Sequence, residues 1–182
     1  MKKFSIIIGL ACIVMLSFSC NKTLQNLFTG FDVKVPDMQV TIPAIPIVTA
    51  NEILLGSFSL NFNLDSTIRA NTNNVFNINS VTSLKISNLL VTISNGTSLN
   101  NLSNFESGRL LISSNSNTTE ATLVNFMFPT IDTYSYVADT NNAPEILSYY
   151  RGTQINYKLF GKLRKPITSA LNLTLSITIR VK

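Results

Sequence analysis

The chain has 182 residues, a net charge of +5 and 45% apolar residues, with few charged side chains and no histidine. The length suits one domain with a real core, and the composition is the opposite of that in disordered chains. Without histidine there is no Ser-His-Asp or Cys-His catalysis, no HExxH zinc site and no His-ligated haem.

The N-terminus is predicted to be a secretory signal peptide that covers residues 1–19. Lys2 and Lys3 form a positive start, and without them the net charge falls from +5 to +3. The nearly all-apolar stretch at 4–18 has the usual length of a signal core. It is short for a membrane span, although a single N-terminal membrane anchor stays the alternative. Small Ser19 ends the predicted signal.

Cysteine usage supports the same interpretation. Cys12 lies in the predicted signal, so the mature chain keeps only Cys20, which excludes a disulfide within it. The segment 16–20 reads Leu-Ser-Phe-Ser-Cys and resembles the lipobox of bacterial lipoproteins, although Leu16 and the bulky Phe18 depart from the strict form. The resemblance implies that Cys20 is acylated and becomes the mature N-terminus. Two or more acyl chains hold a protein stably at a membrane.

Residues 20–30 are predicted to be a tether, and an alternation of apolar and polar residues begins at Phe31. Such alternation is typical of half-buried strands. Prolines interrupt its first stretch, at 33–46, which favours a sheet edge or an extended segment because proline cannot donate to a ladder. A second, cleaner alternation covers residues 57–64.

The stretch at 84–93 is predicted to be a strand with a β-bulge. Its alternation changes phase near Ser87 and Asn88, and one inserted residue would return the later side chains to the core face. Further short strands are predicted at 110–112 and 122–128.

The C-terminal part contains a helix signal followed by the clearest strand. Asn142-Ala143-Pro144-Glu145 combines a possible Asn cap, an early proline and an acid, which predicts a short helix near residues 143–151. Alternation resumes at 155–163. In the last stretch, at 171–182, six apolar side chains share one face, so this strand is expected to be central to the core.

Many short strands without a long amphipathic helix predict an all-β fold, an antiparallel β-sandwich of immunoglobulin-like architecture over residues 31–182. The domain also resembles a group of small Bacteroidota lipoproteins of unknown function. The shared features are the Pro-rich first strand, a strand like 83–94, the segment Asn101 to Ser113, and an aromatic-rich segment that leads into a final alternating strand. The resemblance supports the fold and implies no activity.

The C-terminal third is basic, with no acid between Arg151 and Lys182. The densest group predicts a surface patch for an acidic partner such as anionic lipid or polysaccharide. A solvated sheet face, whose lysines prevent strand-to-strand aggregation, explains the same charges without a ligand. The residues of this predicted patch are Lys158, Lys162, Arg164 and Lys165.

All five tyrosines lie between residues 134 and 157. Clustered tyrosines suit a binding surface, because they are large and rigid with a polar tip. The alternative is that some complete the core and others cover a sheet end. The candidates for an aromatic surface are Tyr134, Tyr136, Tyr149 and Tyr150.

The remaining chemical signals are weak. Asp139, Asn141 and Glu145 form an oxygen cluster of the kind that binds Ca²⁺, but Pro144 stands where an EF-hand needs glycine. An Asx turn explains the same residues. Paired carboxylates could hydrolyse glycosides, although lone loop carboxylates usually face solvent. The sequence therefore assigns no catalytic residue, no metal site and no cofactor.

These observations predict a non-enzymatic, lipid-anchored envelope protein that binds or scaffolds an envelope protein or a glycan, with no nucleic-acid partner. The alternative is a surface glycan-binding lipoprotein, and a carboxylate-dependent glycoside hydrolase is a distant third. Residues 21–25 lack the acidic run that resembles a surface-export tag of Bacteroidota lipoproteins. The expected location is therefore the outer membrane, on its periplasmic face.

Overall fold

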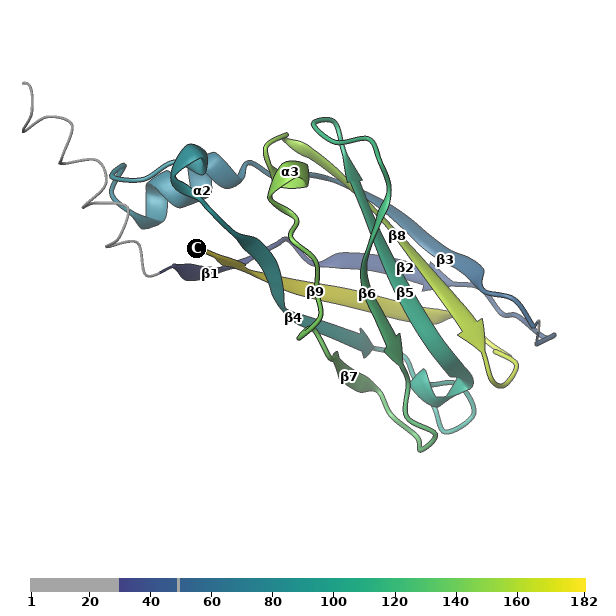
Figure 1. Ribbon diagram of the computed structural model, residues 1–182. Helices are drawn as coiled ribbons and strands as arrows, with labels where there is room; N and C mark the ends of the chain where they lie inside the picture. Colours follow the sequence, from purple (N-terminus) through teal and green to yellow (C-terminus); the bar gives the residue numbers. More distant parts are fainter. Residues whose placement is uncertain (1–29, 49) are drawn as a thin grey trace, which may run out of the picture.

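The computed structural model describes residues 30–48 and 50–182, which form nine strands in two antiparallel sheets. The predicted signal peptide, Cys20 and nearly all of the predicted tether lie outside this range. Figure 1 shows the two sheets facing each other. Buried apolar side chains from both sheets form one core cluster.

The first sheet is organised around the last strand of the chain. Two short strands from the Pro-rich stretch pair one after the other along one side of this strand, at the sheet edge that the prolines predicted. In spatial order, its strands are β1 (Phe31–Lys34) with β2 (Met38–Ile42), then β9 (Leu171–Val181), β4 (Leu84–Ile93) and β7 (Ser135–Ala138).

The second sheet contains the remaining four strands. In spatial order they are β3 (Ile53–Asn61), β8 (Gln154–Leu163), β5 (Phe105–Ser114) and β6 (Ala121–Met127). With β1 and β2 taken as one interrupted strand, the orders are first-eighth-third-sixth and second-seventh-fourth-fifth. This is the order of an eight-stranded jelly roll. The predicted all-β antiparallel sandwich is confirmed, but its strand order is that of a jelly roll and not the immunoglobulin-like order expected from the sequence, because alternation does not specify which strands pair.

The strand β9 supplies the centre of the core, as its alternation predicted. Every second side chain from Leu171 to Val181 is buried, and none of these six is more than 1% exposed. Burial of such side chains contributes about 1.5–3 kcal/mol each. The intervening residues, among them Thr174, lie on the outer face.

The bulge predicted in β4 is confirmed. The register of β4 against β9 shifts between Ile86 and Asn88. Leu84 and Ile86 before the shift are buried, and so are Leu89 and Val91 after it. The extra residue therefore keeps both halves of the strand on the core face.

The alternation at 57–64 predicts a strand through residue 64, but the strand ends at Asn61 and a helix begins at Leu64. This helix, α2 (Leu64–Asn71), is capped by Asn63, whose Oδ1 accepts from the Ser66 amide at 3.0 Å. Asp65 and Arg69 form an ion pair one turn apart at 2.7 Å, and this hydrogen bond lowers the pKa of Asp65. Over a few residues, an apolar-polar alternation is compatible with a strand or with a helix. The Asn63 cap and the Asp65–Arg69 ion pair favour the helix here.

A helix does lie in the predicted range 143–151, but its start was misplaced. The helix α3 (Leu147–Tyr150) has Ile146 at its N-cap, so the predicted Asn142 cap is wrong. Residues 140–143 close a turn instead, in which the Ala143 amide donates to the Thr140 carbonyl at 3.0 Å. Two single-turn helices complete the fold, η1 (Ile78–Ser80) before β4 and η2 (Leu102–Asn104) before β5.

Two neighbouring substitutions in β9 test this arrangement. Leu175→Asp places a carboxylate in the core without a partner, so we expect the protein to lose its cooperative thermal transition. Thr174→Asp, on the outer face, should shift the melting temperature only slightly. Similar losses in both melts would contradict the alternating burial of β9.

Candidate functional site

The connections between strands divide into two groups at opposite ends of the sandwich (Figure 1). The start of β1, the C-terminus and α2 lie at one end. Four connections lie at the other end, and we call them the distal loops. They comprise residues 43–48 with 50–52, 94–104, 128–134 and 164–170.

Buried asparagines join the distal loops to one another. Asn100, Asn101 and Asn104 are all at most 4% exposed. Asn100 Oδ1 accepts from the Thr168 amide at 2.7 Å, and Asn104 Nδ2 donates to the Pro166 carbonyl at 2.8 Å. Asn101 Oδ1 caps η2 by accepting from the amide at position 103. Since buried amides need such partners, this network fixes two loops against each other.

Arg164 ties a third connection into the same network. Its guanidinium donates to three main-chain carbonyls, those of Ser103 at 2.9 Å, Pro129 at 3.1 Å and Phe128 at 3.1 Å. A planar group with five donors is suited to collecting carbonyls that no strand satisfies. The first of the distal loops is held separately, by paired main-chain hydrogen bonds between Ile45 and Ile167.

The distal loops carry most of the exposed apolar surface. Ile47, Leu99 and Ile131 lie on three different loops and are 72%, 74% and 73% exposed. Seven of the nine exposed large apolar side chains in the described part of the chain lie on these loops or at the strand ends beside them. The other four of the seven are Val48, Leu54, Met127 and Tyr134. Exposed apolar groups gathered at one end of a domain are typical of a contact surface.

Sequence reasoning missed this surface. The one available signal was the run Asn100-Asn101 followed by Asn104, since side-chain amides compete with strands for main-chain hydrogen bonds. The exposure of Ile47, Leu99 and Ile131 could not be read locally, because an isolated apolar residue in a loop is equally consistent with burial.

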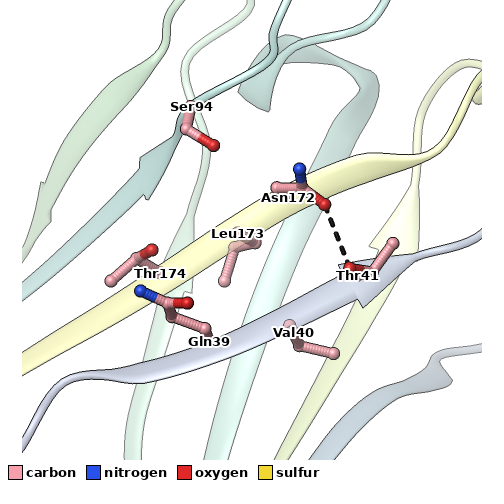
Figure 2. Close-up of a pocket in the computed structure, with 7 residues that line it drawn as sticks. All are labelled: Gln39, Val40, Thr41, Ser94, Asn172, Leu173 and Thr174. Carbon is pink, nitrogen blue, oxygen red and sulfur yellow. Dashed lines mark hydrogen bonds between the residues drawn. The ribbon is translucent and has the colours of Figure 1, made fainter.

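A neutral polar hollow lies on the outer face of the first sheet, next to the distal loops (Figure 2). Its volume is about 390 Å³, and Thr41 Oγ1 donates to Asn172 Oδ1 across it at 3.0 Å. Its lining residues include no charged and no aromatic side chain. They are Gln39, Val40, Thr41, Ser94, Asn172, Leu173 and Thr174.

The four cations of the predicted basic patch make different contacts. Lys158 pairs with Glu120, and Lys162 pairs with Glu106 at 2.9 Å on the outer face of the second sheet. Arg164 binds the loop carbonyls described above, and Lys165 is exposed. Two of the four positive charges are therefore balanced by carboxylates of the chain, which fits a solvated sheet face. Binding of an acidic partner there stays a prediction.

The four candidate tyrosines do not share a surface. Tyr149 and Tyr150 are 7% and 2% exposed, so their assignment to an exposed aromatic surface is wrong. The Tyr150 hydroxyl lies 2.5 Å from that of Tyr157, and burial raises the pKa of both groups. Tyr136 is half-buried, with its ring centroid 5.5 Å from that of Phe128. Tyr134 is 42% exposed on a distal loop.

The candidate Ca²⁺ ligands have other roles. Asp139 Oδ1 accepts from the Asn141 amide at 2.9 Å, which is the Asx turn weighed as the alternative. Glu145 accepts from the Leu84 amide at 2.6 Å and from the Ser83 hydroxyl at 2.7 Å. Within residues 30–48 and 50–182, no group of three or more acidic, cysteine or histidine residues is placed to hold a metal ion.

The carboxylates mostly occupy ion pairs. Six of them pair with a lysine or arginine in the described part of the chain, among them Glu52, which accepts two hydrogen bonds from Arg109 at 2.7 and 2.9 Å. Glu52 and Asp139 line one hollow beside β6. The hydrolase alternative stays a prediction.

The predicted lipidation residue, Cys20, lies outside the described residues. In the ranges that are described, none of the helices has the length and apolar character needed to cross a membrane.

Comparisons with known proteins give no family. No family model matches the chain, and no curated protein matches it significantly. Among solved structures, it is similar to infectious bursal disease virus, Gx strain, at 10% identity and a TM-score of 0.38, over 84% of this chain and 32% of that one. It thus spans about a third of that protein.

Two capsid proteins show a similar degree of likeness. The decameric BFDV capsid protein is 11% identical with a TM-score of 0.31, over 84% of this chain and 99% of its own. The capsid of Helicobacter pylori bacteriophage KHP30 is 6% identical with a TM-score of 0.29, over 85% and 94%. Likenesses of this degree say nothing about activity or partners.

Substitutions of the neighbouring residues Arg164 and Lys165 test the role of Arg164 in the loop network. Arg164→Ala leaves three partly buried carbonyls without their donor, and we expect it to lower the free energy of unfolding by about 2–4 kcal/mol. Lys165→Ala should change it by less than about 0.5 kcal/mol, as is usual at exposed positions. Urea titrations of both variants measure the difference. Equal changes in the free energy of unfolding would mean that Arg164 does not stabilise the loop arrangement.

Proposed function

We propose that this protein is a non-enzymatic binding module, held at the outer membrane by a lipid on Cys20, that contacts an envelope protein through its distal loops. The observation that carries the proposal is the cluster of exposed apolar side chains on loops that are fixed by buried hydrogen bonds. The location, the anchor and the partner are all part of the proposal.

The placement of the loops supports this function. The described chain enters the sandwich at β1, and the distal loops lie at the opposite end (Figure 1). A domain tethered through residues that precede β1 would present Ile47, Leu99 and Ile131 away from its point of attachment. A partner could then reach these side chains without competing with the anchor.

The rigidity of the loops also supports it. Binding orders side chains and loops, and each ordered side chain lowers the affinity by about 0.5–1.5 kcal/mol. Asn100, Asn104 and Arg164 already hold the loops in one arrangement, so less conformational freedom is lost when a partner binds. Exposed Ile and Leu side chains on such a support fit an apolar protein surface.

Glycan binding is the second candidate, and the hollow in Figure 2 is the observation that favours it. Its amide and hydroxyl groups, from Gln39, Thr41 and Asn172, match the hydrogen-bonding groups of a neutral sugar. The lining offers no aromatic ring on which a sugar could stack. We therefore rank this candidate below protein binding.

Mass spectrometry of the native protein tests the anchor. We expect an N-terminal lipopeptide that begins at Cys20, because the chain keeps one cysteine after the signal and acylation of its sulfur attaches the domain to the membrane. Cys20→Ser should leave the envelope fraction and become soluble. An intact Met1 in the envelope fraction would rule the anchor out.

Photo-crosslinking in intact cells tests the distal loops. A photoreactive residue in place of Leu99 should give one discrete protein adduct, because this side chain would lie in the interface. The matched control is Val75, which is 60% exposed but follows α2 at the opposite end. Equal adducts from both positions, or none from Leu99, would refute binding through these loops.

A further inference from the structure

The outer edge of β6 has no strand paired with it in the described part of the chain. The opposite edge of β6 pairs with β5. The Phe128 amide donates to the Glu106 carbonyl at 3.1 Å at the end of this ladder. Hydrogen-bonded positions alternate along antiparallel strands, so Val124 and Phe126 bond to β5. The main-chain groups of Asn125 and Met127 therefore point away from β5.

Two adjacent hollows lie along this edge of β6. One, of about 460 Å³, is lined by four consecutive residues of β6, Thr122 to Asn125, so the strand's main chain forms one of its walls. The other, of about 400 Å³, continues past Asn125 to Met127. Asn125 and Asp139 line both hollows. Together they form a groove that follows the strand, which we call the β6 groove.

The opposite wall of the groove cannot pair with β6. It includes residues of the segment 139–144, in which two amides are already used in turns. The Asn141 amide donates to Asp139 Oδ1, and the Ala143 amide donates to the Thr140 carbonyl. Pro144 has no amide hydrogen to offer. The edge of β6 thus stays open beside a wall that does not compete for it.

The groove has one charge without a counter-charge. Glu52 lines it but is bound by Arg109, whereas Asp139 is exposed and pairs with no cation in the described residues. Met127, which is 60% exposed, adds an apolar side chain on the outer face. An extended segment in this groove would meet unpaired main-chain groups, an apolar side chain and one carboxylate.

We propose that the β6 groove binds an extended peptide segment that carries a basic side chain, by adding it as a fifth strand to the second sheet. Main-chain hydrogen bonds to Asn125 and Met127 supply the affinity, as in other cases of strand addition. The carboxylate of Asp139 selects a Lys or Arg in the segment. The groove adjoins the distal loops at Glu52 and Met127, but Asn125 and Asp139 lie outside those loops, so the two proposals are tested at different residues.

Selection of peptides on the purified full chain in detergent tests the proposal. The probe is a library of random heptapeptides, which have the length of β6. We expect the selected peptides to alternate β-branched residues with polar ones and to contain Lys or Arg. Amide hydrogen exchange then locates them, since the amides of Asn125 and Met127 should exchange quickly alone and become protected with the peptide. The amides of Val124 and Phe126 should be protected in both states.

Two variants separate the main-chain contacts from the charge. Asn125→Pro removes one edge amide that β5 does not use, and it should weaken peptide binding by about tenfold. Asp139→Asn keeps the Asx acceptor but not the charge, and it should weaken binding by about fivefold. Asp37→Asn removes an exposed carboxylate between β1 and β2, outside both surfaces, and as the matched control it should leave binding unchanged.

The outcomes are decisive in both directions. The proposal is overturned if the library yields no enriched peptide, if the peptides bind Asn125→Pro as tightly as the wild type, or if they protect amides elsewhere. If Asn125→Pro fails to fold, the exchange pattern of the wild-type amides decides by itself.

Discussion

The pairing of β9 with strands from both ends of the chain is the constraint on which the structure depends. β9 joins β1 and β2 on one side and β4 on the other, and its six inward side chains are almost completely buried. Because the first and last strands are neighbours, the start of β1 and the C-terminus lie at one end of the sandwich. The connections at the opposite end are then brought together from four distant parts of the sequence, although none of them is long.

Those connections would be mobile if their polar groups were left to water. Instead, Asn100, Asn101 and Asn104 are buried among main-chain groups, and Arg164 collects three carbonyls. A buried amide or guanidinium is tolerated only when it is satisfied, so this network admits few alternative arrangements. In the distal loops, polar side chains are therefore buried and hold the loops in place, whereas apolar side chains such as Leu99 are exposed to solvent. This inversion of the usual pattern distinguishes the distal loops from the rest of the surface, where the exposed groups are mostly hydroxyls, amides and paired charges.

The candidate site residues named from the sequence depended on neighbours that lie far along the chain. Lys158 and Lys162 stand in a stretch without acids, yet they pair with Glu120, just before β6, and with Glu106 in β5. Tyr149 and Tyr150 belong to a cluster of tyrosines that suits a binding surface, yet α3 brings both into the core. Charge balance and burial are properties of the assembled sheet, so a local count of cations or rings could not establish either. The Asx turn at Asp139 was foreseeable, because its donor lies two residues away.

The sequence by itself determined the features whose cause is local. Alternation of apolar and polar residues predicted the all-β sandwich, the buried face of β9 and the bulge at Ser87, because a strand's period of two is set by its own backbone. Only the tertiary structure decided the jelly-roll order, the edge position of β6 and the apolar distal loops. These follow from which strands pair across the whole chain, and many pairings satisfy the same alternation. The short helix α2 falls between the two, since its cap at Asn63 is local but eight residues are too few for periodicity to reveal it.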